Sequence, residues 1–127
     1  MHAEDRTPTS LLHEYVTEGR LQRVQKLLQK GADPNALDSD GLGPLHKAAA
    51  AGDLGCIWVL VQHGADLEAL DSQDYAPLLH AAALGHATAC KELLALGASL
   101  GSLIRGGYTP IITAALNDSS GEVVRAL

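Results

Sequence analysis

Histidine and cysteine side chains are the groups in this sequence most able to bind a metal ion, and the chain has six histidines and two cysteines. His86 and Cys90 are four residues apart, a spacing that places both on one face of a helix and could supply half of a zinc site. No second histidine or cysteine pair lies at a spacing that would complete it. Cys90 also falls in a series of apolar residues that we expect to be buried. We therefore predict no metal site.

Catalytic motifs are the second kind of chemistry that residue spacing can reveal. The sequence has no phosphate-binding loop and no His-Glu-x-x-His zinc motif, and we expect no serine nucleophile. Paired carboxylates occur only where we expect exposed turns, and no low-dielectric pocket would tune their pKa values there. The sequence therefore predicts a chain that is not an enzyme, needs no cofactor and has no small-molecule substrate.

Charge and composition restrict the class of partner and the cellular compartment. The net charge of −6 disfavours nucleic acid and anionic membranes, since both require a basic surface. The apolar stretches, such as residues 81–84, are far shorter than a membrane span. Residues 1–5 are acidic and polar, unlike a secretory signal peptide. With Cys56 and Cys90 interpreted as free thiols, these features predict a cytoplasmic or nuclear protein.

One pentapeptide theme occurs three times at a constant interval of 33 residues. The copies are Gly31-Ala32-Asp33-Pro34-Asn35, Gly64-Ala65-Asp66-Leu67-Glu68 and Gly97-Ala98-Ser99-Leu100-Gly101. Self-similarity at this period is typical of stacked helix-pair repeats. Because one such unit cannot bury its own apolar face, its stability comes from the interfaces with its neighbours.

Prolines and glycines at fixed positions mark the expected helix boundaries. Pro44, Pro77 and Pro110 suit the first position of a helix, where a missing N–H costs nothing. Among the preceding residues, Ala76 has no side-chain acceptor for the helix amides, which should weaken its helix by about 1 kcal/mol. Glycines that permit a left-handed backbone follow each expected helix. They are Gly19, Gly52 and Gly85 after the first helices, and Gly31, Gly64 and Gly97 after the second helices.

Apolar side chains follow a helical period within each unit. The second helices carry Leu21, Val24, Leu27 and Leu28, then Leu54, Ile57, Leu60 and Val61, then Cys90, Leu93 and Leu94. The first helices carry the alanine pairs 48–49, 81–82 and 114–115, whose small size permits close packing between helices. The pattern predicts an all-α fold of stacked antiparallel helix pairs.

The recurring motifs identify the chain as a member of the ankyrin-repeat family. Its Thr-Pro-Leu-His-x-Ala-Ala and Gly-Ala-Asp-x-Asn patterns resemble Pro44-Leu45-His46, Tyr108-Thr109-Pro110 and the pentapeptides above, over nearly the whole chain. The resemblance implies an ankyrin-repeat solenoid with short β-hairpin loops. It divides the chain into an N-terminal capping repeat (1–37), two repeats (38–70 and 71–103) and a partial C-terminal repeat (104–127). It also implies that His13 and His46 bind neighbouring loop backbone.

The two ends differ from the middle. The first unit has Tyr15 and Val16 where the alanine pair is expected, and its helices are rich in charged and amide residues, as an end cap requires. The last unit ends before any terminating glycine, so we expect that the chain is truncated or belongs to a longer array.

In this family, partners bind the concave side formed by the loop tips and the first helices. By register, Leu42, Tyr75 and Tyr108 form one row of tip residues, which would either anchor a partner or shield the loop backbone. A second row, Leu37, Leu70 and Leu103, is expected to be buried support. The remaining predicted contacts are Asp40, Gln73, Leu84, Arg105 and Leu116.

The acidic residues of the tips and the single tryptophan have more than one interpretation. Asp38 and Asp71 match the aspartate that braces the turn in this family, and Asp74 occupies a position where glycine is usual. Asp40 then remains as a free acidic contact. Trp58 is expected on the convex side, where we favour packing over partner contact.

Together, these features predict a non-catalytic protein–protein interaction module, acting as adaptor, scaffold or targeting unit and binding a protein or peptide as a monomer or as part of a larger chain. The alternative is a recognition segment of a larger enzyme or regulatory protein.

Overall fold

The computed structural model describes residues 7–99, and within this range the chain forms six α-helices and no β-strand. The helices are α1 (Pro8–Glu18), α2 (Leu21–Gln29), α3 (Pro44–Ala51), α4 (Leu54–Gln62), α5 (Pro77–Ala83) and α6 (Ala87–Leu96). They form three pairs, α1 with α2, α3 with α4 and α5 with α6.

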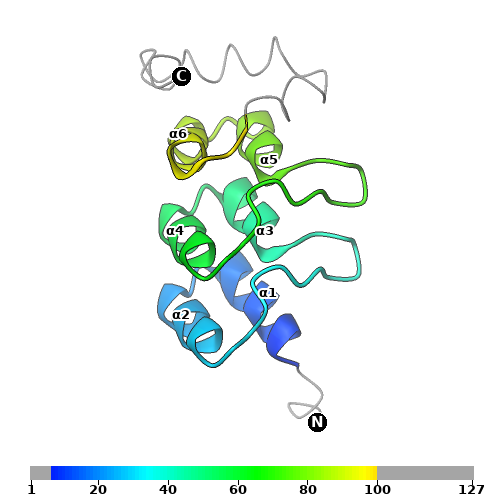
Figure 1. Cartoon of the computed structure of the whole chain (residues 1–127), viewed down its shortest axis with the longest axis vertical. Helices are drawn as coiled ribbons and strands as arrows, with labels where there is room; N and C mark the ends of the chain where they lie inside the picture. Colours follow the sequence, from blue (N-terminus) through cyan, green and yellow to red (C-terminus); the bar gives the residue numbers. More distant parts are fainter. Residues whose placement is uncertain (1–6, 100–127) are drawn as a thin grey trace.

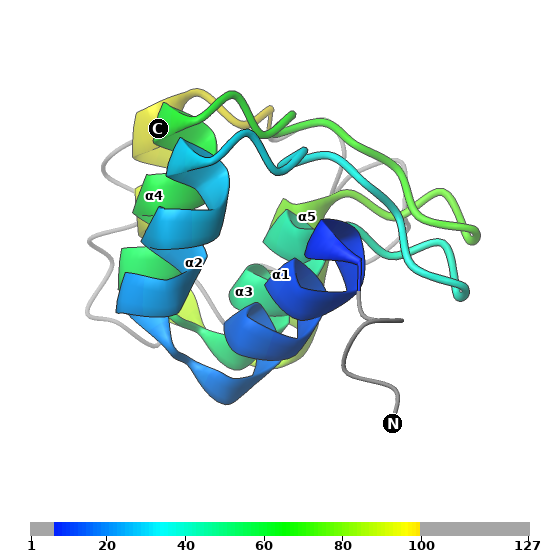
Figure 2. The same ribbon diagram turned by 90° about the horizontal axis from the view of Figure 1, so that it is seen from below.

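The pairs stack in a line (Figure 1), so that α3 packs between α1 and α5, and α4 packs between α2 and α6. The first helices of the pairs thus form one layer and the second helices another. The long loops after α2 and α4 project on the side of α1, α3 and α5 (Figure 2). The predicted all-α solenoid of stacked antiparallel helix pairs is confirmed.

Proline begins the first helix of every described pair. Pro44 and Pro77 begin α3 and α5 as predicted, and Ala76 indeed provides no side-chain cap. Helix α1 begins at Pro8, one turn earlier than the register predicts, because Thr7 caps it: the Thr7 Oγ1 accepts a hydrogen bond from the Ser10 amide at 3.1 Å.

The glycines after the helices adopt the left-handed backbone that the sequence predicts, and Gly52 shows why a larger residue would not fit. Its φ is +68°. A Cβ added there would lie 2.9 Å from Nδ1 of His86, the residue that immediately precedes α6. The turn between α3 and α4 therefore packs directly against the next helix pair.

The core lies between the two helix layers and between successive pairs. Equivalent positions of the second helices, Val24, Ile57 and Cys90, are fully buried. The alanine pairs of α3 and α5 are also buried, which lets these helices approach closely. Fully burying a leucine-sized side chain contributes about 1.5–3 kcal/mol, so the stack derives its stability mainly from these interfaces.

Side chains at equivalent positions also connect successive loops. Asn35 Oδ1 accepts a hydrogen bond from the Asp66 amide at 2.7 Å, and its Nδ2 donates to the Gly64 carbonyl at 3.1 Å. Glu68, 33 residues later, accepts from the Ser99 amide at 2.8 Å. These hydrogen bonds thus connect each loop to the next one along the stack.

The projecting loops differ from the β-hairpins that the family resemblance implies. In the first loop the Asp38 amide donates to the Leu42 carbonyl at 2.9 Å, and the second loop repeats this bond from Asp71 to Tyr75 at 3.0 Å. Each described loop therefore ends in a tight turn without a strand ladder. The predicted helix start at Thr109 and Pro110, with the rest of residues 104–127, lies outside the described residues.

Candidate interaction groove

The two loop tips, residues 37–43 (tip 1) and 70–76 (tip 2), are rigid because an aspartate holds each turn from inside. Asp38 Oδ1 accepts hydrogen bonds from the amides of Asp40 and Leu42, at 2.9 and 3.0 Å. Asp71 Oδ1 accepts from the amides of Gln73 and Tyr75, at 2.8 and 2.9 Å. The predicted bracing role of both aspartates is confirmed.

The two tips also share an unusual backbone conformation. Gly41 has φ +79° and Asp74, at the equivalent position, has φ +65°. Asp74 is the only non-glycine residue with positive φ between residues 7 and 99. Aspartate tolerates this conformation better than most residues, as the sequence predicts. Aspartate at this position places an exposed carboxylate beside the exposed side-chain amide of Gln73 and leaves the turn intact.

Each bracing aspartate also binds a cationic or titratable side chain of the following first helix. Lys47 Nζ lies 2.7 Å from Asp38 Oδ2, and His80 Nε2, at the equivalent position, lies 2.8 Å from Asp71 Oδ2. Burial alone would raise the pKa of Asp38, but the Lys47 hydrogen bond and the two amides lower it to about 2. The pKa of Asp71 is also lowered, since the amide of Tyr75 and the His80 ring outweigh its burial. Both carboxylates are therefore ionised at neutral pH.

His46 connects α3 to tip 2. Its Nδ1 accepts a hydrogen bond from the Gly43 amide at 3.1 Å, so the proton is on Nε2, which donates to the Tyr75 carbonyl at 2.8 Å. Burial lowers the pKa of His46, which keeps the ring neutral. His13 donates from Nε2 to the Ala36 carbonyl at 2.7 Å in the same way. The predicted contact of both rings with loop backbone is confirmed.

His46, Asp71 and His80 form a cluster that sequence spacing did not reveal, because the loop of the third pair brings distant residues together. One ligand atom of each lies within 4.8 Å of the others. However, both nitrogens of His46 already make hydrogen bonds, and Asp71 Oδ1 accepts two amides. A cation would have to break these bonds, so the arrangement fits a hydrogen-bond network better than a metal site.

A hollow of about 230 Å³ lies between tip 2 and α5. Three of the predicted contact residues line it: Gln73, Tyr75 and Leu84. The remaining lining residues are Leu79, His80 and Ala83. The Tyr75 ring is half-buried and meets the His80 ring edge-on, with centroids 6.3 Å apart. Leu84 is 58% exposed, so an apolar side chain is open to a partner here.

A second hollow, of about 360 Å³, lies between tip 1, α1 and α3. Its lining is polar: Thr7, Thr9, Ser10, His13, Asp38, Ser39 and Lys47. The Ser72 hydroxyl donates to the Asp40 carbonyl at 3.1 Å and so joins the two tips. We call the surface formed by both tips, both hollows and the exposed sides of α1, α3 and α5 the groove. It is apolar beside tip 2 and polar beside tip 1.

The predicted contact residues on the first tip are only partly available. Asp40 is exposed and Leu42 is half-buried. Arg105, Tyr108 and Leu116 lie outside the described residues. The side chains of Leu42 and Tyr75 therefore partly cover their tips and are partly exposed to solvent.

Two predictions about apolar side chains are wrong. Leu37 and Leu70 were expected to be buried, but they are 53% and 44% exposed. Both leucines lie in irregular loop segments just before the bracing aspartates, where the neighbouring helices cover only about half of each side chain. Trp58, expected to pack, is 49% exposed on α4.

Residues 97–101 match a sequence pattern of serine nucleophiles, which the expectation of no serine nucleophile overlooked. Gly97-Ala98-Ser99-Leu100-Gly101 fits Gly-x-Ser-x-Gly, whose serine requires a sharp turn from a strand into a helix. Here Gly97 instead ends helix α6 with φ +115°, and the Ser99 amide binds Glu68. Among the described residues, Ser99 is therefore preceded by a helix and not by the strand that a serine nucleophile requires.

Neither cysteine is placed for chemistry. Both are fully buried, and burial raises the pKa of Cys56 to about 12 and that of Cys90 to about 11. His86 uses its Nε2 to bind the Ala50 carbonyl at 2.9 Å, which ties α6 to the end of α3. In the described part of the chain, no helix is both long enough and apolar enough to cross a membrane.

Stacked helix pairs, braced loop tips and an open groove define the class of repeat proteins that present an extended binding surface. Within this class, a profile of three ankyrin repeats matches residues 12–104, which is more than half of the chain, and the chain belongs to the ankyrin-repeat family. The comparison with curated proteins gave no match. Ankyrin repeats are generally protein–protein interaction modules, and the family is typically non-catalytic.

Proposed function

We propose that the chain is a non-catalytic adaptor, scaffold or targeting module that binds a protein or peptide in the groove. The hollow beside tip 2 carries this proposal, because three predicted contacts, Gln73, Tyr75 and Leu84, line it together. The ring of Tyr75 has few rotatable bonds and lies in the same hollow as the exposed Leu84 and the amide of Gln73. An aromatic anchor among apolar and polar groups is typical of interface hot spots.

Exposed leucines extend the apolar part of this surface along the loops. Leu37 and Leu70 precede the bracing aspartates and are each about half exposed. Burying such a side chain against a partner contributes about 1–2 kcal/mol, so two or three of them account for a useful part of a micromolar affinity. The exposed carboxylates of Asp40 and Asp74 support a protein partner over a nucleic acid, since phosphates would be repelled.

The experiment compares Tyr75→Ala/Leu84→Ala with Leu54→Ala, which removes an exposed leucine from α4 outside the groove. Tagged chains are used to capture partners, and the bound proteins are quantified by mass spectrometry. We expect the groove variant to lose at least about 90% of the specifically bound partner, in line with the loss of hot-spot residues, and the Leu54 variant to retain it.

Circular dichroism serves as the control for folding in both variants. If the groove variant retains its helical signal and binds the same partners as the wild type, the proposal is wrong.

We further propose the repeat boundaries 1–37, 38–70, 71–103 and 104–127, and a cytoplasmic or nuclear location. The helix pairs at residues 8–29, 44–62 and 77–96 support the first three units. The two buried free thiols support a reducing compartment.

A further inference from the structure

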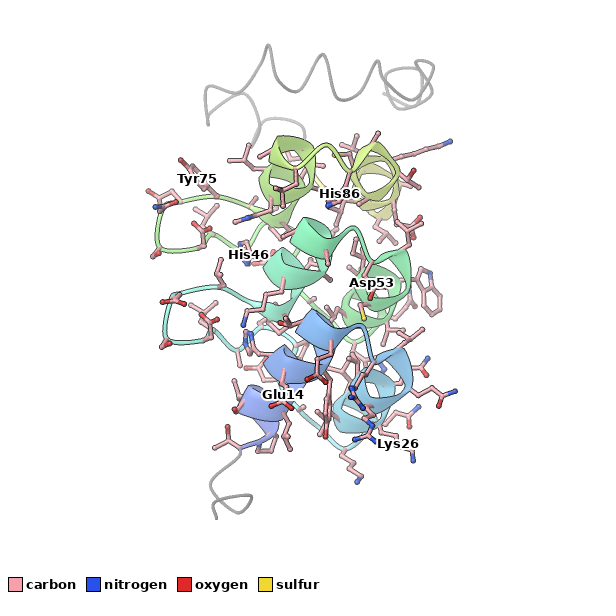
Figure 3. All side chains as sticks on the ribbon, turned by 180° about the vertical axis from the view of Figure 1, so that it is seen from behind. Glu14, Lys26, His46, Asp53, Tyr75 and His86 are labelled. Atoms are coloured by element: carbon pink, nitrogen blue, oxygen red, sulfur yellow. The ribbon has the colours of Figure 1, made fainter. Side chains whose placement is uncertain are left out.

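The end of the stack formed by α1 and α2 carries a second surface, whose lining shares no residue with the two groove hollows. A hollow of about 380 Å³ lies there, lined by Leu11, Tyr15, Arg23, Lys26, Leu27 and Lys30, which we call the end face. Figure 3 shows Lys26 at this end of the stack and Tyr75 on a projecting loop at the opposite corner. The two surfaces can therefore be tested separately.

Comparison by register shows that the end face is not shaped for another helix pair. In the second pair, the positions equivalent to Tyr15, Arg23 and Lys26 are the buried residues Ala48, Cys56 and Val59.

These three small or apolar residues pack against the neighbouring pair, whereas the end face presents a larger ring and two cations. Leu11, Tyr15 and Leu27 nevertheless remain only half-buried, so an apolar floor is left open beneath the cations.

The basic charges of the end face stand out in an acidic chain. Helix α2 contains no acidic residue, although the chain as a whole has a net charge of −6. Arg20 pairs with Glu18 at 2.6 Å, but Arg23, Lys26 and Lys30 form no ion pair with any residue between 7 and 99. These three residues follow one side of α2 at intervals of three and four residues, over roughly 10 Å of helix.

The helix dipole does not favour the cation at the start of α2. Arg23 is in the first turn of the helix, where the macrodipole is positive and a cation is unfavourable, and α2 begins without a side-chain cap. By contrast, Asp53 caps the start of α4, and its carboxylate accepts a hydrogen bond from the Cys56 amide. The Arg23 guanidinium lies over the Tyr15 ring, 5.5 Å from its centroid, which holds it above the apolar floor.

We propose that the end face binds an acidic amphipathic helix of a partner protein. The end face is a hollow between α1 and α2 with an apolar floor, and such a surface suits the apolar side of a third helix. Glutamate or aspartate residues flanking that side would then meet Arg23, Lys26 and Lys30. A phosphate-bearing polymer would find the same cations but would leave the apolar floor uncovered.

The test uses a fluorescein-labelled peptide of about 14 residues, with leucines at helical spacing and glutamates on both flanks, and measures its binding by anisotropy. The variant Arg23→Gln/Lys26→Gln is compared with Gln22→Glu/Gln29→Glu, which lowers the net charge by the same amount at exposed positions of the same helix. We expect the first variant to bind at least about tenfold more weakly and the second to change affinity by no more than about twofold.

Two further arms separate the alternatives. A peptide with serines in place of the leucines should lose binding, because it cannot cover the floor, and the groove variant Tyr75→Ala/Leu84→Ala should bind the acidic peptide as the wild type does. The proposal is overturned if the wild type does not bind the leucine peptide, or if both charge variants weaken it equally. It is also overturned if a single-stranded oligonucleotide or phosphatidylserine vesicles bind through Arg23 and Lys26 while the peptide does not.

Discussion

The rings of His13 and His46 occupy equivalent positions and make the same bond through Nε2, but they differ at Nδ1. In His46 the Gly43 amide satisfies Nδ1, because that amide precedes the helix. In α1 the equivalent amide belongs to Ser10, which is inside the longer helix and donates to Thr7. His13 Nδ1 is therefore buried without a hydrogen-bond partner among the described residues. An extra helical turn thus costs this ring one bond.

Acid should destabilise the fold through these rings. Burial lowers the pKa of both, so below about pH 6.5 the unfolded chain binds more protons than the folded chain, and the free energy of unfolding falls as pH falls. His46→Gln can keep the donated bond to the Tyr75 carbonyl but cannot titrate. We expect it to lose about 1 kcal/mol at about pH 7.5 and to show a smaller decrease between pH 7.5 and 5.5 than the wild type. Urea unfolding at several pH values measures both.

His63→Gln is the matched control, since His63 is exposed at the end of α4. It should follow the wild-type pH dependence. Identical pH slopes in His46→Gln and the wild type would show that the buried ring does not cause the effect.

At the scale of the helix pairs, the glycine turns can require a left-handed backbone and also free space at the Cβ position. Substitutions at two glycines can separate these two requirements. Gly52 and Gly85 both have a left-handed backbone, with φ of +68° and +76°. A Cβ on Gly85 meets no atom within 4 Å, whereas one on Gly52 meets the His86 ring. Gly85→Ala should therefore cost about 1 kcal/mol for the backbone alone. Gly52→Ala should cost at least about 1 kcal/mol more, because the ring must move.

Thermal and urea unfolding of the two variants would measure this difference. Equal losses of stability in both would mean that the His86 ring moves aside freely and does not fix the turn.

The helices and their stacking could be predicted from the sequence, because proline, glycine and apolar positions recur at one period. The repeat register alone misses the start of α1, since the cap at Thr7 has no counterpart at the equivalent position of the later pairs, although Thr7 followed by Pro8 is itself a local signal for a helix start. The exposure of Leu37 depends on how much of its side chain the neighbouring helices cover, which residue type alone does not determine. The His46–Asp71–His80 cluster was missed for a related reason: contact between a helix and the following loop requires the stack to exist.

For the whole molecule, linear stacking means that each pair is stabilised only by its neighbours. Helix α4 packs against both α2 and α6, whereas the described part of the chain covers α2 on one side only. The cost of an identical substitution should therefore depend on its place in the stack. Leu27 and Leu60 occupy equivalent positions, but Leu60 is fully buried and Leu27 is half-buried at the end face.

We expect Leu60→Ala to lower the free energy of unfolding by about 3–4 kcal/mol, because it leaves a cavity that the neighbours cannot fill. Leu27→Ala should cost about 1 kcal/mol, since part of its side chain already contacts water. Urea denaturation with a common slope would compare them. Similar losses for the two leucines would indicate that stability is spread over the molecule and does not depend on neighbouring pairs.

The burial of both natural thiols has a practical consequence for studying this molecule. With pKa values of about 12 and 11, Cys56 and Cys90 remain protonated and buried at neutral pH. A cysteine introduced at an exposed site such as Ser72 would therefore react first with a maleimide dye or spin label. Distances and motions along the loops could then be followed without first removing the native sulfur atoms.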